Sequence, residues 1–367
     1  DLPHIWVKPL VASPASPPNL DPNPRMAHRT FFWFILPSLA AMLLFIALPL
    51  VSVAVQSLHI EHEQVLKVTK NCGPFGCKEE TTVDAKATQM LRAEKPLGRF
   101  NGLKTYFDRG HLATAEVAQA WQTRSSLGGF FSDLYNLPLY KAIGFTLVYT
   151  FVVTPLVILL GLTIALGVNR VTPILKGPTI FVSLLPMIVT PLIGSLILFW
   201  MIDANGIIGK SLQYLFADPE LSLKASPALT WMTLIVYGIW HSAPFAFVVF
   251  YAGLQTVNSD SLEAAQIDGA NRWQQLRYVV IPHLMPLVIF ISLIQLMDNF
   301  RVFEPIVGFS AQANATSLSF IIFNDLRGDV MRFNSAAATS VLTILGVTIL
   351  LLPVLIRTWR DFKGKAI

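Results

Sequence analysis

Charged residues are scarce in this chain of 367 residues: they make up 13% of it, whereas hydrophobic residues make up 53%. That charged share is about half of the share in an average soluble domain. The hydrophobic residues stand in long blocks without charge rather than at the periods of a soluble core. The net charge of +5 forms no basic cluster, because Lys and Arg lie between these blocks, which excludes a nucleic-acid-binding surface. The composition predicts an integral membrane protein.

The sequence also lacks the patterns of catalytic centres. It contains no HExxH, no nucleophile elbow and no pair of carboxylates that demands an enzyme. We therefore predict a chain with no catalytic residue, no metal and no bound cofactor. The segment ANGIIGKS, residues 204–211, matches the loose form of a phosphate-binding loop. A working loop of that kind follows a β-strand, but this one follows a predicted membrane span, so we do not interpret it as a nucleotide site.

Cysteine is scarce as well, with only Cys72 and Cys77, in the segment NCGPFGC. The topology described below places this segment outside the cytoplasm, where disulfides persist. We predict that the two cysteines form a disulfide. Two free thiols and a partial metal site are the alternatives, and no second Cys/His pair nearby supports a metal.

The long apolar blocks predict about six transmembrane helices, since a span needs about 20 apolar residues. The first, 31–58, is too long for the apolar region of a signal peptide. The predicted spans are 31–58, 142–168, 177–202, 229–256, 284–308 and 335–356. The predicted organisation is a disordered or non-native tail over 1–25, a first transmembrane segment over 26–58, an extracytoplasmic loop or cap over 59–137, a transmembrane core over 138–357 and a cytoplasmic tail over 358–367.

The distribution of Lys and Arg between the short loops predicts the orientation, because cytoplasmic loops carry the excess. With both termini in the cytoplasm, that side receives Arg29, Arg170, Lys176, Arg272, Arg277, Arg357, Arg360, Lys363 and Lys365. The short loops on the opposite side hold only Lys210, Lys224, Arg327 and Arg332. The insertion of about 80 residues between the first two spans is exempt from the rule because of its length. Its mixture of polar runs and aromatic residues suggests a small helical cap.

The largest loop on the predicted inner face, 257–283, holds most of the segment EAAQIDGANRWQQLRYVVIPHLMP, residues 263–286. It resembles the EAA loop of permease subunits in binding-protein-dependent ABC importers. The matching residues are Glu263, Ala264, Ala265, Asp268, Gly269, Ala270 and Pro282. The departures are Leu276, where Phe is usual, with Val279 and Ile281 where Ile and Leu are usual. Gly269 permits a sharp turn between two short helices. The alternative to a loop that docks on a partner subunit is a surface helix-turn-helix with no partner.

The resemblance extends over nearly all of residues 31–360 and includes FNGLKTYF and NATSLSFIIFNDL. It is to the carbohydrate-uptake, maltose-transporter-like branch of the family. It implies an all-α membrane protein with a type I importer core, located in the bacterial cytoplasmic (inner) membrane and carrying a sugar, oligosaccharide or polyol. The implied partners are a second, different permease subunit, two ATPase subunits that use ATP and Mg, and an extracytoplasmic solute-binding protein. A non-carbohydrate solute and, in a different class, an ion-coupled secondary transporter are the alternatives.

Ionisable residues inside a span are costly and usually functional. The fifth predicted span carries Gln295, Asp298 and Asn299 at i, i+3 and i+4, and therefore on one helix face. Arg301 is three residues from both Asp298 and Glu304 and can pair with either. The fourth span offers further candidates, which are Tyr237, Trp240 and His241. The predicted substrate-binding residues are Gln295, Asp298, Asn299, Arg301, Tyr237, Trp240 and His241. A salt bridge between Arg301 and Glu304 at the outer interface is the structural alternative.

Overall fold

The computed structural model describes residues 24–62, 65–73, 76–124, 126–327 and 331–364. The tail predicted for 1–25 lies almost wholly outside these residues. The chain divides into two compact units, 1–52 and 53–367. The first unit contains α1 (Pro24–Met42), the π-helix η1 (Leu43–Ala47) and the start of α2 (Leu48–Ser57). The continuous stretch Phe31–Ser57, 27 residues of high hydropathy, is long enough to cross a membrane.

The larger unit carries the other spans. The described part of the chain contains five helices long and apolar enough to cross a membrane, or six if one bent pair forms a span. This confirms the predicted class of a mostly helical membrane protein. The four unbroken spans of this unit are α7 (Pro138–Arg170), α11 (Pro227–Leu254), the continuous stretch of α13 (Arg272–Gln275), η2 (Leu276–Val280) and α14 (Ile281–Phe300), and α17 (Phe333–Gly364).

The third predicted span, 177–202, is not one helix. It consists of α8 (Pro173–Ile188) and α9 (Pro191–Met201), whose axes differ by 93°. Proline disfavours a helical conformation at the residue before it, and Thr190 accordingly has an extended backbone ahead of Pro191. The break follows from this local rule, although the hydropathy of the segment is continuous.

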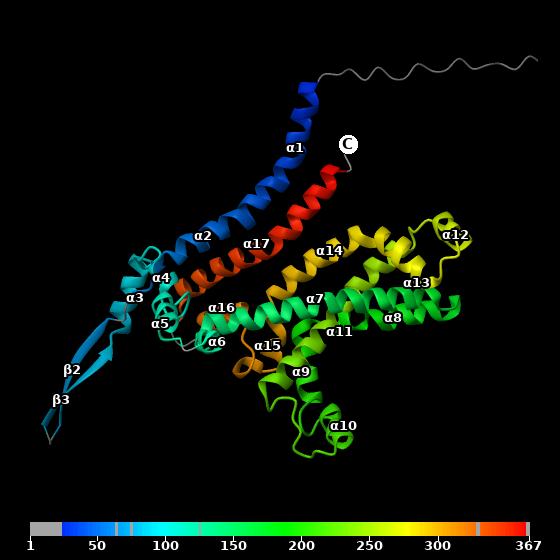
Figure 1. The fold of residues 1–367 in the computed structure, drawn as a ribbon. Coiled ribbons are helices and arrows are strands. Elements are labelled where there is room, and N and C mark those ends of the chain that lie inside the picture. Colours follow the sequence, from blue (N-terminus) through cyan, green and yellow to red (C-terminus); the bar gives the residue numbers. More distant parts are fainter. Residues whose placement is uncertain (1–23, 63–64, 74–75, 125, 328–330, 365–367) are drawn as a thin grey trace, which may run out of the picture. The chain divides into compact units, whose positions relative to one another are not determined.

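The packed core lies where α7 and α11 run side by side (Figure 1). Phe145 and Val153 of α7 are fully buried, as are Phe247 and Phe250 of α11. The two backbones approach closely at Gly161, where a Cβ atom would lie 2.6 Å from the Cβ of Ala246. Helices α6 (Leu127–Tyr135), α8, α14, α15 (Glu304–Gly308) and α16 (Leu318–Arg327) of the larger unit pack against this pair.

The insertion at 59–137 contains strands as well as helices, which the expectation of a helical cap did not include. Strands β2 (Leu66–Gly73) and β3 (Gly76–Val83) form an antiparallel hairpin, and β1 (His59–Ile60) pairs with β4 (Arg99–Phe100). The hairpin register places Cys72 opposite Cys77. The helices of the insertion are α3 (Ala85–Glu94), α4 (Lys104–Phe107), α5 (Thr114–Thr123) and α6 (Leu127–Tyr135).

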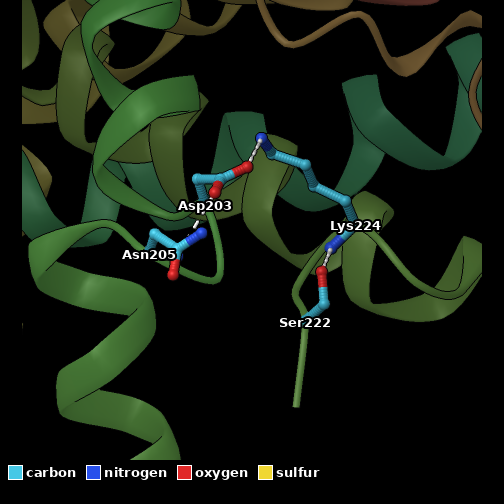
Figure 2. Close-up of polar contacts among 4 residues, drawn as sticks. All are labelled: Asp203, Asn205, Ser222 and Lys224. Atoms are coloured by element: carbon cyan, nitrogen blue, oxygen red, sulfur yellow. Dashed lines mark hydrogen bonds and ion pairs between the residues drawn. The ribbon is translucent and has the colours of Figure 1, made fainter. Parts of the chain in front are cut away.

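Several short elements complete the larger unit. They are α10 (Ile207–Phe216), α12 (Ser259–Ile267), α15 (Glu304–Gly308), η3 (Ala311–Ala313) and α16 (Leu318–Arg327). The chain after α9 is fastened by an ion pair of 3.1 Å between Lys224 Nζ and Asp203 Oδ2, and the backbone N–H of Asn205 donates to the same carboxylate (Figure 2). The Asn205 N–H and then the Lys224 ammonium hold the pKa of Asp203 below its usual value.

Candidate functional site

A cavity of about 580 Å³ lies inside the larger unit, between α11, α14 and the break in the third span. Six of the seven predicted substrate-binding residues line it: Tyr237, His241, Gln295, Asp298, Asn299 and Arg301. Sequence positions 237–241 and 295–301 thus meet in space, because α11 and α14 are neighbours.

The wall contributed by α14 is polar and mostly buried. Gln295 and Asn299 are 4% and 5% exposed. Asn299 Nδ2 donates to Thr154 Oγ1 of α7 at 3.0 Å, which fixes its orientation. Gln295 Oε1, in contrast, is buried and finds no hydrogen-bond partner among the residues described. An unpaired buried acceptor costs free energy, so this amide is available to a ligand.

The carboxyl end of α14 carries the charges of the cavity. Arg301 Nη2 pairs with Asp298 Oδ1 at 2.9 Å, and both side chains are more than half exposed. Of the two partners left open by the sequence, the structure therefore selects Asp298 and not Glu304. The helix ends at Phe300, with Arg301 as its C-cap, whereas the predicted span continued to 308. Arg301 and Glu304 consequently lie beyond the helix, and Glu304 begins α15.

The wall contributed by α11 closes the break between α8 and α9. Tyr237 Oη donates to the carbonyl of Pro191 at 2.7 Å, and His241 Nε2 lies 3.2 Å from the carbonyl of Val189. A carbonyl only accepts, so Nε2 of His241 is the donor. These two side chains satisfy backbone groups that a broken helix leaves free. They therefore hold the bend that shapes the cavity.

Trp240 is the exception among the predicted residues. It does not line this cavity but an apolar groove of about 1050 Å³ between α9, α10 and α11. Neighbouring positions on a helix point about 100° apart, which separates Trp240 from His241. Conversely, the sequence did not single out Tyr149, Met187, Ser242 or Phe245, which do line the cavity. Ser242 adjoins His241 and Tyr149 lies on α7, but neither position carries a local signal in the sequence.

The cavity combines donors and acceptors, and its charged groups are the carboxylates of Asp298 and Glu304 and the guanidinium of Arg301. No group of three or more His, Cys, Asp or Glu side chains suited to a metal occurs in the described part of the chain. The lining instead offers an amide, a guanidinium, a carboxylate, an imidazole and a phenol. Such a lining can bind and orient a polar solute.

The EAA loop forms a second candidate region, built around Gly269. After α12, the N–H of Gly269 bonds to the carbonyl of Gln266 at 3.0 Å, and the N–H of Ala270 bonds to that of Ala265 at 2.9 Å. This is the Schellman arrangement, which needs a left-handed residue after the helix. Gly269 supplies it with φ of +79°, and Asp268 is the C-cap.

The second short helix of the loop begins with a capping box, in which Asn271 and Gln274 bond each other's backbone N–H groups. Pro282 follows η2 at the start of α14, inside the continuous helical stretch Arg272–Phe300. Glu263 and Ala264 of the motif are exposed. Three large side chains of the same region are exposed as well: Ile267 by 87%, Trp273 by 66% and Tyr278 by 69%. The loop therefore presents an apolar surface on a rigid backbone.

Comparison with known proteins identifies the class. Residues 125–359 match the family described as binding-protein-dependent transport system inner membrane component. The chain belongs to this family: it is the transmembrane permease component of an ABC importer, a multi-pass inner-membrane protein and not a catalytic one. The predicted family and the prediction that the chain is not an enzyme are both confirmed.

Individual relatives are distant. The chain is 29% identical over 202 residues to the trehalose transport system permease protein SugA of Mycobacterium tuberculosis, which covers 54% of this chain and 64% of the relative. It is 29% identical over 221 residues to the trehalose/maltose transport system permease protein MalF of Thermococcus litoralis, covering 57% and 72%. A solved bacterial ABC transporter involved in the import of the acidic polysaccharide alginate is similar with a TM-score of 0.53 at 23% identity, over 76% of this chain and 97% of that one; this likeness supports the fold alone.

Proposed function

We propose that this permease carries a sugar, oligosaccharide or polyol through the cavity between α11 and α14. The observation that supports this most is the unpaired, buried Oε1 of Gln295 beside Asn299 and the Asp298–Arg301 pair. A hydroxyl group both donates and accepts hydrogen bonds, so a polyhydroxylated solute can satisfy amide, carboxylate and guanidinium groups together. The relatives named for trehalose and maltose transport favour the same class of solute.

The exposed EAA loop, 257–283, is the proposed contact with the ATPases. Its Schellman turn and capping box give a backbone that transmits force as a unit, and Ile267, Trp273 and Tyr278 offer apolar surface to a partner. The proposed complex contains a second permease subunit, two ATPase subunits that use ATP and Mg, and an extracytoplasmic solute-binding protein. Both termini and this loop would then lie in the cytoplasm, as the distribution of Lys and Arg predicts.

Transport would proceed by alternating access. Closure of the ATPases would move the docked loop, and the loop is continuous with α14 through η2. Because Gln295, Asp298 and Asn299 stand near the other end of the same helix, rigid-body motion of α14 would alter one wall of the cavity. The bend between α8 and α9, held by Tyr237 and His241, would form an opposing wall.

The test is uptake of radiolabelled trehalose by proteoliposomes that contain the complete transporter. Gln295→Leu removes the unpaired amide at similar volume, and we expect uptake to fall about tenfold, the effect of roughly 1.4 kcal/mol of lost binding. Trp240→Phe is the matched control, because Trp240 faces the apolar groove, and it should transport like the wild type. Wild-type uptake by Gln295→Leu, or equal losses in both variants, would contradict the proposed site.

The alternatives give different results in the same assay. If the solute is not a carbohydrate, the complete transporter should hydrolyse ATP but not accumulate trehalose, maltose or sorbitol. An ion-coupled secondary transporter would accumulate solute under an imposed proton or sodium gradient without ATP. The broken span α8–α9 is a feature of that class too, but membership of the ABC importer family favours ATP as the energy source.

A further inference from the structure

A second cavity, of about 540 Å³, lies where the insertion meets the beginning of α17. Its lining includes Glu61 and His62 after β1, Gly110 and His111 after α4, and Asn334 and Ser335 in the first turn of α17. It shares no lining residue with the cavity between α11 and α14. We refer to it as the outer cavity.

The outer cavity gathers buried polar atoms that have no partner. Among the residues described, four such atoms belong to its lining: Glu61 Oε1, His62 Nε2, His111 Nδ1 and Asn334 Nδ2. His111 and Asn334 are each only 3% exposed. Each unpaired buried group costs about 1–3 kcal/mol, and one cavity collects four of them. A concentration of this kind indicates a place that a polar ligand or ordered solvent completes.

The contacts of these residues fix what the unpaired atoms can do. His111 Nε2 lies 3.2 Å from the carbonyl of Ser335, so it must donate, which leaves Nδ1 of the neutral ring as an acceptor. Asn334 Oδ1 accepts from Gln56 Nε2, so its free Nδ2 is a donor. Glu61 Oε1 is an acceptor when ionised. The cavity therefore offers unpaired groups of both kinds.

The charges of the lining cancel. Arg92 and Arg332 supply two positive charges, while Glu61 and Asp108 supply two negative ones. In the described part of the chain no group of three His, Cys, Asp or Glu side chains is suited to a metal. Because the charges of the lining cancel, a ligand with net charge would gain little electrostatic free energy from it. A hydroxyl group donates and accepts at once, and the volume is within the range of small-molecule sites.

We propose that the outer cavity is a second ligand site, which takes a neutral molecule with several hydroxyl groups, either a saccharide or a polyol. The proposed site consists of the atoms of this cavity alone, so it does not depend on which solute the permease transports. A ligand site differs from a pocket that holds only solvent in how it responds to ligand. Binding of the saccharide or polyol should be saturable, and it should be blocked when a side chain fills the cavity.

Gly110 allows a large side chain to be introduced at the outer cavity, because the space beside its Cα is open. It lines the space, and a Cβ atom there would meet nothing within 4 Å. The blocking variant is Gly110→Trp. Gly128→Trp in α6 is the matched control, since the nearest atom to its Cβ, Ser126 Oγ, lies 3.9 Å away and Gly128 does not line the cavity. Asn334→Leu, which removes the free donor, provides an independent variant.

The experiment is calorimetric titration of the full chain in lipid nanodiscs with trehalose and, separately, with sorbitol. All variants are also made in a Gln295→Leu background, so that binding between α11 and α14 is weakened. We expect saturable binding to persist in Gln295→Leu and to weaken at least tenfold when Gly110→Trp or Asn334→Leu is added, but not with Gly128→Trp. Trehalose alone would identify a saccharide site, and sorbitol as well would identify a polyol site.

Several results would overturn the proposal. If Gln295→Leu removes all binding, the outer cavity holds only solvent, while the proposed transport site stands. If binding persists in Gln295→Leu but does not respond to Gly110→Trp, the ligand sits elsewhere. Saturable binding of sulfate, with no binding of trehalose or sorbitol, would show an anion site. If the wild type binds neither trehalose nor sorbitol, the proposal fails, and the uptake assay decides the transport site separately.

Discussion

Two glycines with left-handed backbones, one in the EAA loop and one in the insertion, are constrained for different reasons. Gly269, in the EAA loop, has φ of +79° and open space where a Cβ atom would stand. Gly98, in the insertion, has φ of +85°, and its Cβ atom would lie 2.2 Å from the carbonyl oxygen of Ile60. Only backbone conformation constrains Gly269, whereas packing against β1 also constrains Gly98. The EAA loop is thus ordered locally at Gly269, and the insertion is ordered at Gly98 by a contact distant in sequence.

The largest effect is expected for Gly269→Pro. Proline fixes φ near −65°, which the turn cannot accept, and it also removes the N–H that bonds to Gln266. We predict that ATP-driven uptake by the reconstituted transporter is abolished and that ATPase subunits no longer copurify, while membrane insertion is unchanged. Gly269→Asn is the control, because Asn tolerates the left-handed region, and it should retain most transport. Normal uptake by a well-expressed Gly269→Pro variant would show that the turn does not couple the subunits.

A smaller and more local effect is expected for Gly98→Ala. The left-handed conformation costs about 1–3 kcal/mol for a residue other than Gly, and the contact with Ile60 would force β1 and β4 apart. We predict faster hydrogen exchange at residues 59–62 and 99–101, with unchanged exchange in α7 and α11. Gly110→Ala, for which open space is available, is the control. Unchanged exchange in Gly98→Ala would mean that the pairing of these strands does not depend on the tight contact.

The distinction between local order and contacts distant in sequence also explains which features the sequence predicted. Around Gly269 the order is local, so the motif alone indicated the turn, and the face shared by Gln295 and Asn299 followed from helical periodicity. In the hairpin of β2 and β3 the apolar residues Leu66, Val68 and Val83 are exposed, so their alternation does not mark a buried face. The bend before Pro191 was hidden because hydropathy continues across it. Whether Trp240 or Tyr149 enters the cavity depends on how α7, α9 and α11 pack, which no local pattern contains.

The hairpin of β2 and β3 offers a further comparison with the EAA loop, because a covalent bond can add to the pairing of its two strands. Residues directly opposite in antiparallel strands have Cα atoms about 4.5–5.5 Å apart, within the range of a disulfide, and Cys72 and Cys77 are such a pair. The short loop limits the gain to about 2–3 kcal/mol. We predict labelling of intact cells by a membrane-impermeant maleimide only after reduction. Labelling without reductant would reject the bridge; labelling only in opened cells would overturn the orientation.

The smallest effect is expected for Lys210→Ala, in the segment that matches a phosphate-binding loop. The element before it is the helix α9, not a strand, and Lys210 is an exposed residue of α10. Gly209 has a packing role instead, since a Cβ atom there would lie 1.9 Å from the carbonyl oxygen of Asp203. We therefore predict wild-type uptake and nucleotide binding for Lys210→Ala, measured with labelled ATP on the purified complex. Gly209→Ala should disturb the turn between α9 and α10 without changing nucleotide binding. If Lys210→Ala alone abolishes that binding, this chain contributes to an ATP site, and the division of labour between permease and ATPase subunits would need revision.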